Sequence, residues 1–586
     1  MFNKYLFLTS KEFFYLILKL NKKNFFITSF LNILISIIFG LTTSSCLVIG
    51  VNLKHKTPSK PFIYPSFTRC DSLRGYLSNY RACYDVKFYE LFIDFDINKK
   101  SIDGKVIVTA QAKKNFNRLQ IDLYKNMYID SILYNEEKLP YTRECNAVFI
   151  DFPKYFTNDD FFSFTVFYHG KPQIARRPPW EGGFVWRKDK RGKPWVGVAC
   201  ELYGSSLWWP SKDHLTDEPD SMLMHYTVPK GLNVIANGNL IDSISLNDKT
   251  TYTWKVSYPI NTYNTTFYIG DFENFSIPYS SDSSNFMMNF FVHEENINLA
   301  KVHFEQAKSV INCFEKFYGA YPFPRDGYKL VESPFAGMEH QSAIAYGNNF
   351  NNNSYSHGDY IMIHETAHEW WGNSVTATDY AEIWLHEGFA TYSEALFVEM
   401  QAGYEEYLKF LAIYSVLIKN KRPIIGPYDV NYWDYKDADV YMKGALLLHT
   451  LRNTIGNDSV FFDILKTFYQ NFKYGSAKTK DFIEIVNNKT KKDYTSFFNQ
   501  YLYSRVCPTL LWEFNYDIIT NQTFIYYRWK ENVNNDFTIP ITIQVNEKNV
   551  TIWPTKELKR TELPYAISIK LNTKGSYISL KRTKKF

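Results

Sequence analysis

The sequence predicts a multidomain α+β protein. Three observations support this fold class: apolar residues alternate with polar ones over 66–275, recur at three- and four-residue steps over 276–505, and alternate again over 506–586. Alternation is typical of half-buried strands, and the longer period is typical of amphipathic helices. With 586 residues, 45% hydrophobic and 22% charged, the chain is long enough for several domains and does not have the composition of a disordered protein.

Residues 1–65 are predicted to be a signal or membrane anchor followed by a tether. Lysines within residues 19–23 precede an uncharged, largely apolar run from Phe25 to Leu53. A basic flank before about 20 apolar residues is typical of an export signal or a single membrane span. Small residues before Cys46 leave lipidation of that cysteine open. We therefore expect an exported protein that is membrane-anchored, periplasmic or in the cell envelope, and the sequence does not decide whether the segment is cleaved.

Residues 66–275 are expected to form a large antiparallel β domain. Every second residue from Tyr89 to Ile97 is apolar, a turn is expected over 98–104, and the alternation resumes at Val106. Further strands are expected over 163–168, 222–228 and 251–258.

The seven cysteines are too few for a disulfide scaffold. Cys70 and Cys83 are close enough in the sequence to pair if the compartment is oxidising.

Helical spacing dominates residues 276–505. One helix is predicted over 296–318, ended by Gly319, and another from Tyr360 through Trp371, ended at 372–373. Alternation over 537–545 and 550–552 then predicts a small β module within 506–586.

The helix that begins at Tyr360 carries the sequence HETAH, a pattern typical of a metal centre. Four residues at about 100° each bring the imidazoles of His364 and His368 to one helix face, with the Glu365 carboxylate beside the ion. Eighteen residues separate His368 from Glu387, which a following helix could supply as the third ligand. Two imidazoles and one carboxylate leave a fourth position for water, as in a hydrolytic site with one Zn²⁺. The alternative, exposed histidines with solvated carboxylates, is disfavoured by the position of Glu387.

The segments HETAHEWWGN (364–373) and WLHEGFATY (384–392) resemble the gluzincin zinc aminopeptidase family, which includes aminopeptidase N and leukotriene hydrolase. Residues 335–340 are similar to the exopeptidase motif of that family, and 440–445 to the segment that bears its catalytic tyrosine. Glu201 lies where the family has a substrate-binding glutamine.

The resemblance spans 66–586. It implies an N-terminal antiparallel β saddle (66–275), a thermolysin-like, mainly α catalytic domain (276–505) and a small C-terminal β-sandwich (506–586). It also implies a short form that lacks the long C-terminal helical domain of many relatives.

The resemblance also implies roles for individual residues. Glu365 would be the general base for metal-activated water and Tyr441 would stabilise the charge that develops on the carbonyl oxygen. Glu339 would bind the α-ammonium of the substrate, Glu201 would add a second contact, and Gly337 would let the substrate backbone approach closely. The metal ligands would be His364, His368 and Glu387.

We therefore expect a zinc metallopeptidase that removes N-terminal residues from peptides. Two alternatives stay open, a zinc endopeptidase and a catalytically inactive scaffold that binds peptides. The net charge of +6 is mild for this length and favours no nucleic-acid partner. His340 replaces the asparagine of the family motif, and Glu201 replaces its glutamine, so the side-chain preference stays undetermined. The oligomeric state and the physiological substrate are also left open by the sequence.

Overall fold

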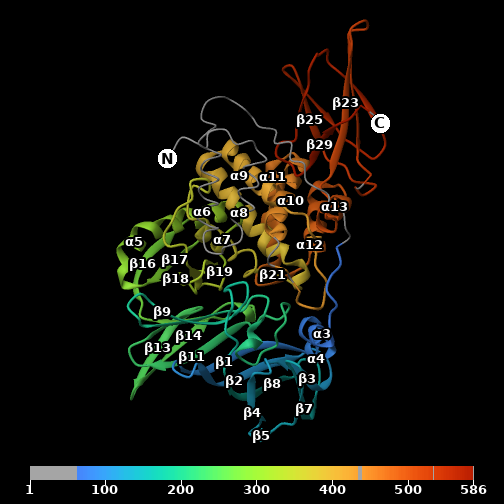
Figure 1. The fold of residues 1–586 in the computed structure, drawn as a ribbon. Coiled ribbons are helices and arrows are strands. Elements are labelled where there is room, and N and C mark those ends of the chain that lie inside the picture. Colours follow the sequence, from blue (N-terminus) through green and yellow to red (C-terminus); the bar gives the residue numbers. More distant parts are fainter. Residues whose placement is uncertain (1–61, 433, 435–437, 532, 585) are drawn as a thin grey trace, which may run out of the picture. The chain divides into compact units, whose positions relative to one another are not determined.

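The computed structural model of the chain describes residues 62–432, 434, 438–531, 533–584 and 586 (Figure 1). All of the described residues belong to one compact unit, residues 52–586. The predicted apolar run and Cys46 lie outside the described residues. Among the helices that are described, none has the length and apolar character needed to cross a membrane.

The largest sheet has eight strands. In sheet order they are β13 (Asn239–Leu246), β14 (Lys249–Val256), β11 (Ser221–Pro229), β1 (Tyr84–Asp96), β2 (Ser101–Ala112), β8 (Phe161–Gly170), β4 (Met127–Tyr134) and β5 (Glu137–Lys138). The expected antiparallel pairing is found for the other neighbouring strands of this sheet, but it is wrong for β1 and β11, which pair in parallel. Between them the chain passes through two smaller sheets, and such a long crossover connection, unlike a hairpin, permits parallel pairing.

Two smaller sheets complete the N-terminal region. One has the order β12 (Asn233–Ala236), β15 (Phe267–Gly270), β10 (Pro194–Ala199), β9 (Gly183–Lys188), and the other the order β3 (Phe116–Asp122), β7 (Ala147–Phe156), β6 (Tyr141–Glu144). The short helices here are α3 (Arg69–Gly75), α4 (Asn79–Ala82), η1 (Ser205–Leu207) and η2 (Thr262–Asn264).

The turn after β1 is shorter than expected. It occupies residues 97–100, and Gly104 lies within β2. A Cβ on Gly104 would lie 2.3 Å from the ring of Tyr168 in β8. The glycine therefore makes room for a neighbouring ring and does not mark a turn.

The disulfide prediction is wrong in its partner. Cys70 in α3 pairs with Cys145, with the two Cα atoms 5.8 Å apart, and Cys83 is a free, buried thiol. Cys145 lies in the β6–β7 turn, where its φ is 54°. The turn brings a cysteine that is 75 residues away next to α3, so proximity in the sequence was not a guide.

The helical region begins with a five-stranded sheet in the order β16 (Glu273–Ser280), β17 (Asn285–Val292), β18 (Tyr328–Glu332), β20 (Ile344–Tyr346), β19 (Gly337–Met338). β16 runs across residue 275, so strands continue past the predicted start of the helical domain. The helices are η3 (Glu294–Asn296), α5 (Ile297–His303), η4 (Phe304–Gln306), α6 (Ala307–Tyr318), α7 (Tyr360–Ala367), η5 (Tyr380–Glu382), α8 (Trp384–Ala402), α9 (Tyr404–Leu417), α10 (Asp439–Ile455), α11 (Asp458–Phe472), α12 (Thr479–Thr490) and α13 (Thr495–Leu502). β21 (Val375–Ala377) and β22 (Gly475–Ala477) form a separate pair.

Two predicted helices differ from expectation in their limits. The one expected over 296–318 is divided by η4, but it ends before Gly319 as predicted, where φ is 116°. The helix expected to reach Trp371 ends at Ala367, with His368 as its cap. The chain then turns, and the Trp371 carbonyl accepts a hydrogen bond of 2.9 Å from His368 Nδ1.

The C-terminal β module is present as two sheets. One has the order β27 (Lys559–Leu563), β24 (Gln522–Trp529), β23 (Thr509–Asp517), β29 (Ser579–Arg582), and the other β26 (Lys548–Ile552), β25 (Ile541–Val545), β28 (Lys570–Asn572). Of the strand expected over 537–545, only the second half pairs. The combination of several β-sheets with a helical region agrees with the predicted fold class.

Candidate metal centre and active site

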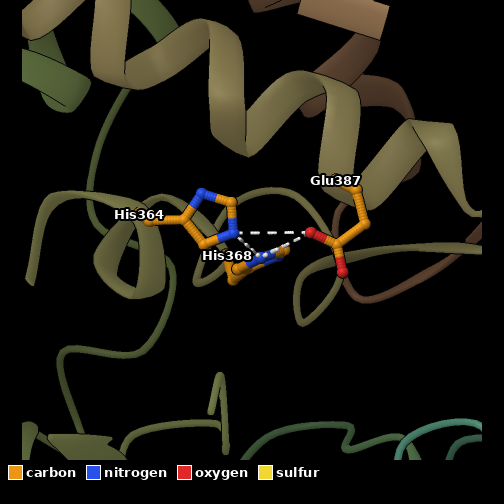
Figure 2. A group of neighbouring side chains, drawn as sticks. All are labelled: His364, His368 and Glu387. Atoms are coloured by element: carbon orange, nitrogen blue, oxygen red, sulfur yellow. Dashed lines mark hydrogen bonds and ion pairs between the residues drawn. The ribbon is translucent and has the colours of Figure 1, made fainter. Parts of the chain in front are cut away.

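Two helices bring together the three predicted metal ligands (Figure 2). His364 lies in the last turn of α7, His368 caps that helix, and Glu387 lies in the first turn of α8. His364 Nε2 is 3.1 Å from His368 Nε2, and Glu387 Oε2 is 3.4 Å and 3.6 Å from these two nitrogens. The start of α7 is fixed by Asp359, whose carboxylate accepts hydrogen bonds from the backbone N–H groups of residues 361 and 362.

The geometry fits a single zinc ion. Tetrahedral zinc bonds of about 2.0–2.1 Å place donor atoms about 3.4 Å apart, which agrees with the three observed separations. The Trp371 carbonyl can only accept, so His368 donates from Nδ1 and presents a lone pair at Nε2. Two imidazole lone pairs and a buried carboxylate oxygen that accepts no hydrogen bond thus face one point, and a cation there would satisfy all three.

One residue that the sequence analysis missed orients this centre. Glu394 lies on α8 seven residues after Glu387, two helical turns along the same face. Its Oε1 is 2.8 Å from His364 Nδ1, and its Oε2 accepts a hydrogen bond of 2.7 Å from Tyr414 of α9. A carboxylate in this position fixes the ring and its tautomer and makes Nε2 a stronger ligand. The seven-residue spacing between Glu387 and Glu394 is the sequence feature from which this residue could have been predicted.

Glu365 is buried beside the three ligands and is not one of them. A Cβ on Gly337 would lie 2.2 Å from Glu365 Oε1, so the strand β19 leaves room for this carboxylate by having no side chain there. Burial, opposed by the two histidines and reinforced by neighbouring carboxylates, raises the pKa of Glu365 to about 8. A carboxylate with a raised pKa is a stronger base than one in water.

Glu339 is held next to the centre by a chain of polar contacts. Its backbone carbonyl accepts 2.8 Å from the Asn373 side chain, and its Oε1 accepts 3.3 Å from the Tyr263 hydroxyl. Asn264 in turn donates to Asn373 at 2.8 Å. Residues of η2 therefore hold Glu339 against the turn that follows α7.

Glu201 lies just after β10 and is also buried, with no hydrogen-bond partner for its Oε1. Burial and then the charge of Glu339 raise the pKa of Glu201 well above its usual range. Burial likewise raises the pKa of Glu339, against the effect of His368. Two buried carboxylates near each other favour a cationic ligand between them.

His340, the departure from the family motif, is fully buried. The Tyr268 hydroxyl donates to the Ala343 carbonyl at 2.7 Å and lies 2.7 Å from His340 Nδ1. His340 therefore fixes the loop after Glu339 to strand β15.

Tyr441 lies in the first turn of α10, with its ring centroid 6.1 Å from that of His364. Burial, with the charge of Glu387 next in size, raises the pKa of Tyr441 well above its usual range, so the hydroxyl keeps its proton. Two glycines bring α10 this close. A Cβ on Gly444 would lie 2.8 Å from the Cα of Gly388, the residue after Glu387 in α8. The structure therefore gathers all eight predicted site residues around one centre.

Residues 302–501 match the model of a protein family that is described as the Peptidase family M1 domain. This range contains the three convergent donors. This part of the chain is similar to peptidase M1 domains. This match and the similarity to known aminopeptidases described next confirm the predicted resemblance to the gluzincin aminopeptidase family.

Two relatives illustrate the similarity of this chain to known proteins. Aminopeptidase N of Lactococcus lactis is 22% identical over 443 residues, which cover 71% of this chain and 50% of that protein. Probable aminopeptidase 1 of Sulfurisphaera tokodaii is 25% identical over 393 residues, which cover 62% of this chain and 48% of that protein. The chain spans about half the length of these curated relatives.

Solved structures share the fold. The M1 zinc metallopeptidase of Deinococcus radiodurans superposes with a TM-score of 0.61 at 20% identity, covering 72% of this chain and 95% of that one. A variant of the same protein bound to a Tyr-Ser-Ala substrate gives the same TM-score and coverage. The multidomain fold of β-sheets with a helical region is therefore similar to the fold of this metallopeptidase.

Proposed function

We propose that the protein is a zinc-dependent aminopeptidase that hydrolyses N-terminal residues from peptides. The observation that carries this proposal is the convergence of His364 Nε2, His368 Nε2 and Glu387 Oε2 on one point, with three further buried carboxylates around it. Three donors at zinc spacing support a metal centre, and the additional carboxylates support the binding of a cationic substrate group.

Each residue has a distinct part in the proposed reaction. Zinc, when bound, polarises the scissile carbonyl and lowers the pKa of water. Glu365 takes a proton from the attacking water and passes it to the amine nitrogen as the C–N bond breaks. The Tyr441 hydroxyl, which stays protonated, donates a hydrogen bond to the carbonyl oxygen as negative charge develops there.

Glu339 and Glu201 distinguish the proposed activity from its alternatives. An endopeptidase has no α-ammonium to bind, so two buried carboxylates without a cationic partner would only oppose folding. An inactive scaffold has no need of Glu365 or of the close Gly337 that accommodates it. Gly337 has a second proposed part, which is to let the substrate backbone approach.

We also propose the finer architecture and location that the sequence predicts. The sheets of residues 66–275 would form the β saddle, 276–505 the thermolysin-like catalytic domain, and the two C-terminal sheets a β-sandwich. The protein would be exported and attached to a membrane through its N-terminal segment. The Cys70–Cys145 disulfide supports export, because such bonds persist in oxidising compartments.

Hydrolysis of a panel of aminoacyl fluorogenic amides tests the activity. Each amide is supplied with a free amine and with an acetylated amine, using zinc-loaded protein. We expect turnover of the free amines only. Equal turnover of acetylated substrates would favour the endopeptidase, and no turnover of any substrate by zinc-loaded protein would favour the scaffold.

A further inference from the structure

Residues 62–75, which we call the strap, precede the first sheet and end in α3 (Figure 1, dark blue). None of them was predicted to belong to the active site. They contact two segments that flank it, the turn that carries Glu201 and the segment 422–432 that precedes α10.

The first half of the strap holds the segment 422–432. The Tyr64 hydroxyl donates to the Ile425 carbonyl at 3.1 Å, and the rings of Tyr64 and Phe67 pack edge-on against Tyr432, with centroids 6.1 and 5.5 Å away. Tyrosine and phenylalanine edges against a ring face are favourable contacts.

The segment 422–432 is in turn bonded to η5, the turn directly before the ligand helix α8. Gly426 N donates to the Ala381 carbonyl at 2.9 Å, and Asp429 N donates to the Asp379 carboxylate at 2.9 Å. The strap is therefore connected to α8, the helix that carries Glu387, through a single intervening segment, residues 422–432.

The last two residues of the strap contact both flanking segments. The Arg74 guanidinium donates to the carbonyl of Leu202, the residue after Glu201, and lies 5.8 Å from the ring of Tyr203. Gly75 lies against the other segment, since a Cβ there would be 2.3 Å from the backbone nitrogen of Val430. Two adjacent residues thus link the Glu201 turn to the segment 422–432, which is hydrogen-bonded to the turn directly before α8.

The strap is itself fixed to the N-terminal sheets. The Cys70–Cys145 disulfide joins it to the β6–β7 turn. The ion pair between Arg69 and the neighbouring Glu144 is exposed to solvent and adds little to this attachment. The Arg74 carbonyl accepts 2.9 Å from Arg81 Nη1. The backbone of Arg74 is therefore fixed, which limits the positions from which its side chain can reach the Leu202 carbonyl.

We propose that the strap is a positioning element of the active site, with Arg74 as the residue that sets where Glu201 stands relative to the zinc ligands. This inference rests on the proposed aminopeptidase function. Arg74 contacts no substrate in this account. It acts through the Leu202 carbonyl, and a shift of about 1 Å in a binding carboxylate is enough to weaken recognition of the α-ammonium markedly.

The test compares Arg74→Met with Arg74→Lys and with a matched control, Arg69→Met. Methionine keeps the apolar stem and removes the donors, lysine restores one donor, and Arg69 lies in the same strap without touching the Glu201 turn. On free-amine aminoacyl amides we expect Arg74→Met to raise KM about tenfold, which corresponds to about 1.4 kcal/mol. We expect kcat, zinc content and Tm to stay close to wild type, Arg74→Lys to recover part of the loss, and Arg69→Met to match wild type.

A second variant, Tyr64→Phe, probes the other end of the strap by removing one hydroxyl. We expect KM to rise about 2- to 12-fold, the effect expected from the loss of one hydrogen bond. Unchanged KM in Arg74→Met would overturn the inference whatever Tyr64→Phe shows, as would a rise that is equal in Arg69→Met or that merely follows a loss of folded protein. If the wild type itself does not hydrolyse free-amine substrates, the proposed function fails instead, so the two failures are distinguishable.

Discussion

Replacing Gly337 by alanine should disable Glu365, the proposed proton carrier, while leaving the metal bound. A Cβ at this position would lie 2.2, 2.7 and 2.9 Å from three side-chain atoms of Glu365. Because non-bonded heavy atoms prefer separations of about 3.5 Å, the carboxylate oxygen must retreat by about 1 Å. A displacement of that size in a reacting group costs about 100-fold in rate, or about 2.7 kcal/mol.

The measurements are kcat and KM on a free-amine fluorogenic amide, together with zinc content. We expect kcat to fall about 100-fold with one zinc per chain retained, because no ligand atom is among the three nearest neighbours of the new methyl group. Gly475→Ala is the matched control, since a Cβ there meets only one carbonyl oxygen, at 3.8 Å. A zinc-loaded Gly337→Ala protein with kcat within threefold of wild type would refute the assigned role of Glu365. A rise in KM alone would indicate that Gly337 acts through the approach of the substrate backbone.

Four further perturbations test the remaining assignments. Glu365→Gln should keep its zinc and lose about 10²- to 10⁴-fold in kcat, and undiminished turnover would mean that another group carries the proton. Glu394→Gln should weaken zinc binding about 10- to 100-fold in a chelator competition, because the His364 ring loses its charged partner, and an unchanged affinity would contradict this role. Glu339→Ala should raise KM and lower kcat on free-amine substrates, whereas unchanged kinetics would remove it from ammonium binding. Cys70→Ser opens a crosslink spanning 75 residues and should lower the unfolding free energy by about 4 kcal/mol on chain entropy, so an unchanged Tm would argue against this bond.

The zinc ligands were predictable because their geometry is mostly local. Two histidines four residues apart share a face of any α-helix, and Glu387 needed only that the next helix pack against the first. The helix ends at Ala367 and not at Trp371, yet this error did not matter, since the capping residue His368 still has helical φ and ψ. The resemblance to a family then assigned Glu339, Glu201 and Tyr441, none of which has a distinctive local pattern.

Features that depend on distant contacts were not predictable from the sequence. The pairing of Cys70 with Cys145 and the parallel pairing of β1 with β11 depend on how the chain returns over more than 70 residues. Gly104 was interpreted as part of a turn. The sequence does not distinguish a glycine that allows a turn from one that makes room for a ring on another strand. Glu394 could have been found by extending the ligand spacing by two helical turns.

The contact between Gly388 and Gly444 has a consequence for how the family motifs constrain each other. Each glycine follows a functional residue within one helical turn, Gly388 after Glu387 and Gly444 after Tyr441. Since the two backbones are in direct contact there, only the Cα hydrogen atoms separate the helices, and there is no room for a side chain. A methyl group on either glycine would push the two helices apart and move the Tyr441 hydroxyl away from the carbonyl oxygen that it is proposed to stabilise. The two positions are therefore coupled. A larger residue at either glycine could be tolerated only if another group replaced Tyr441 as the hydroxyl donor.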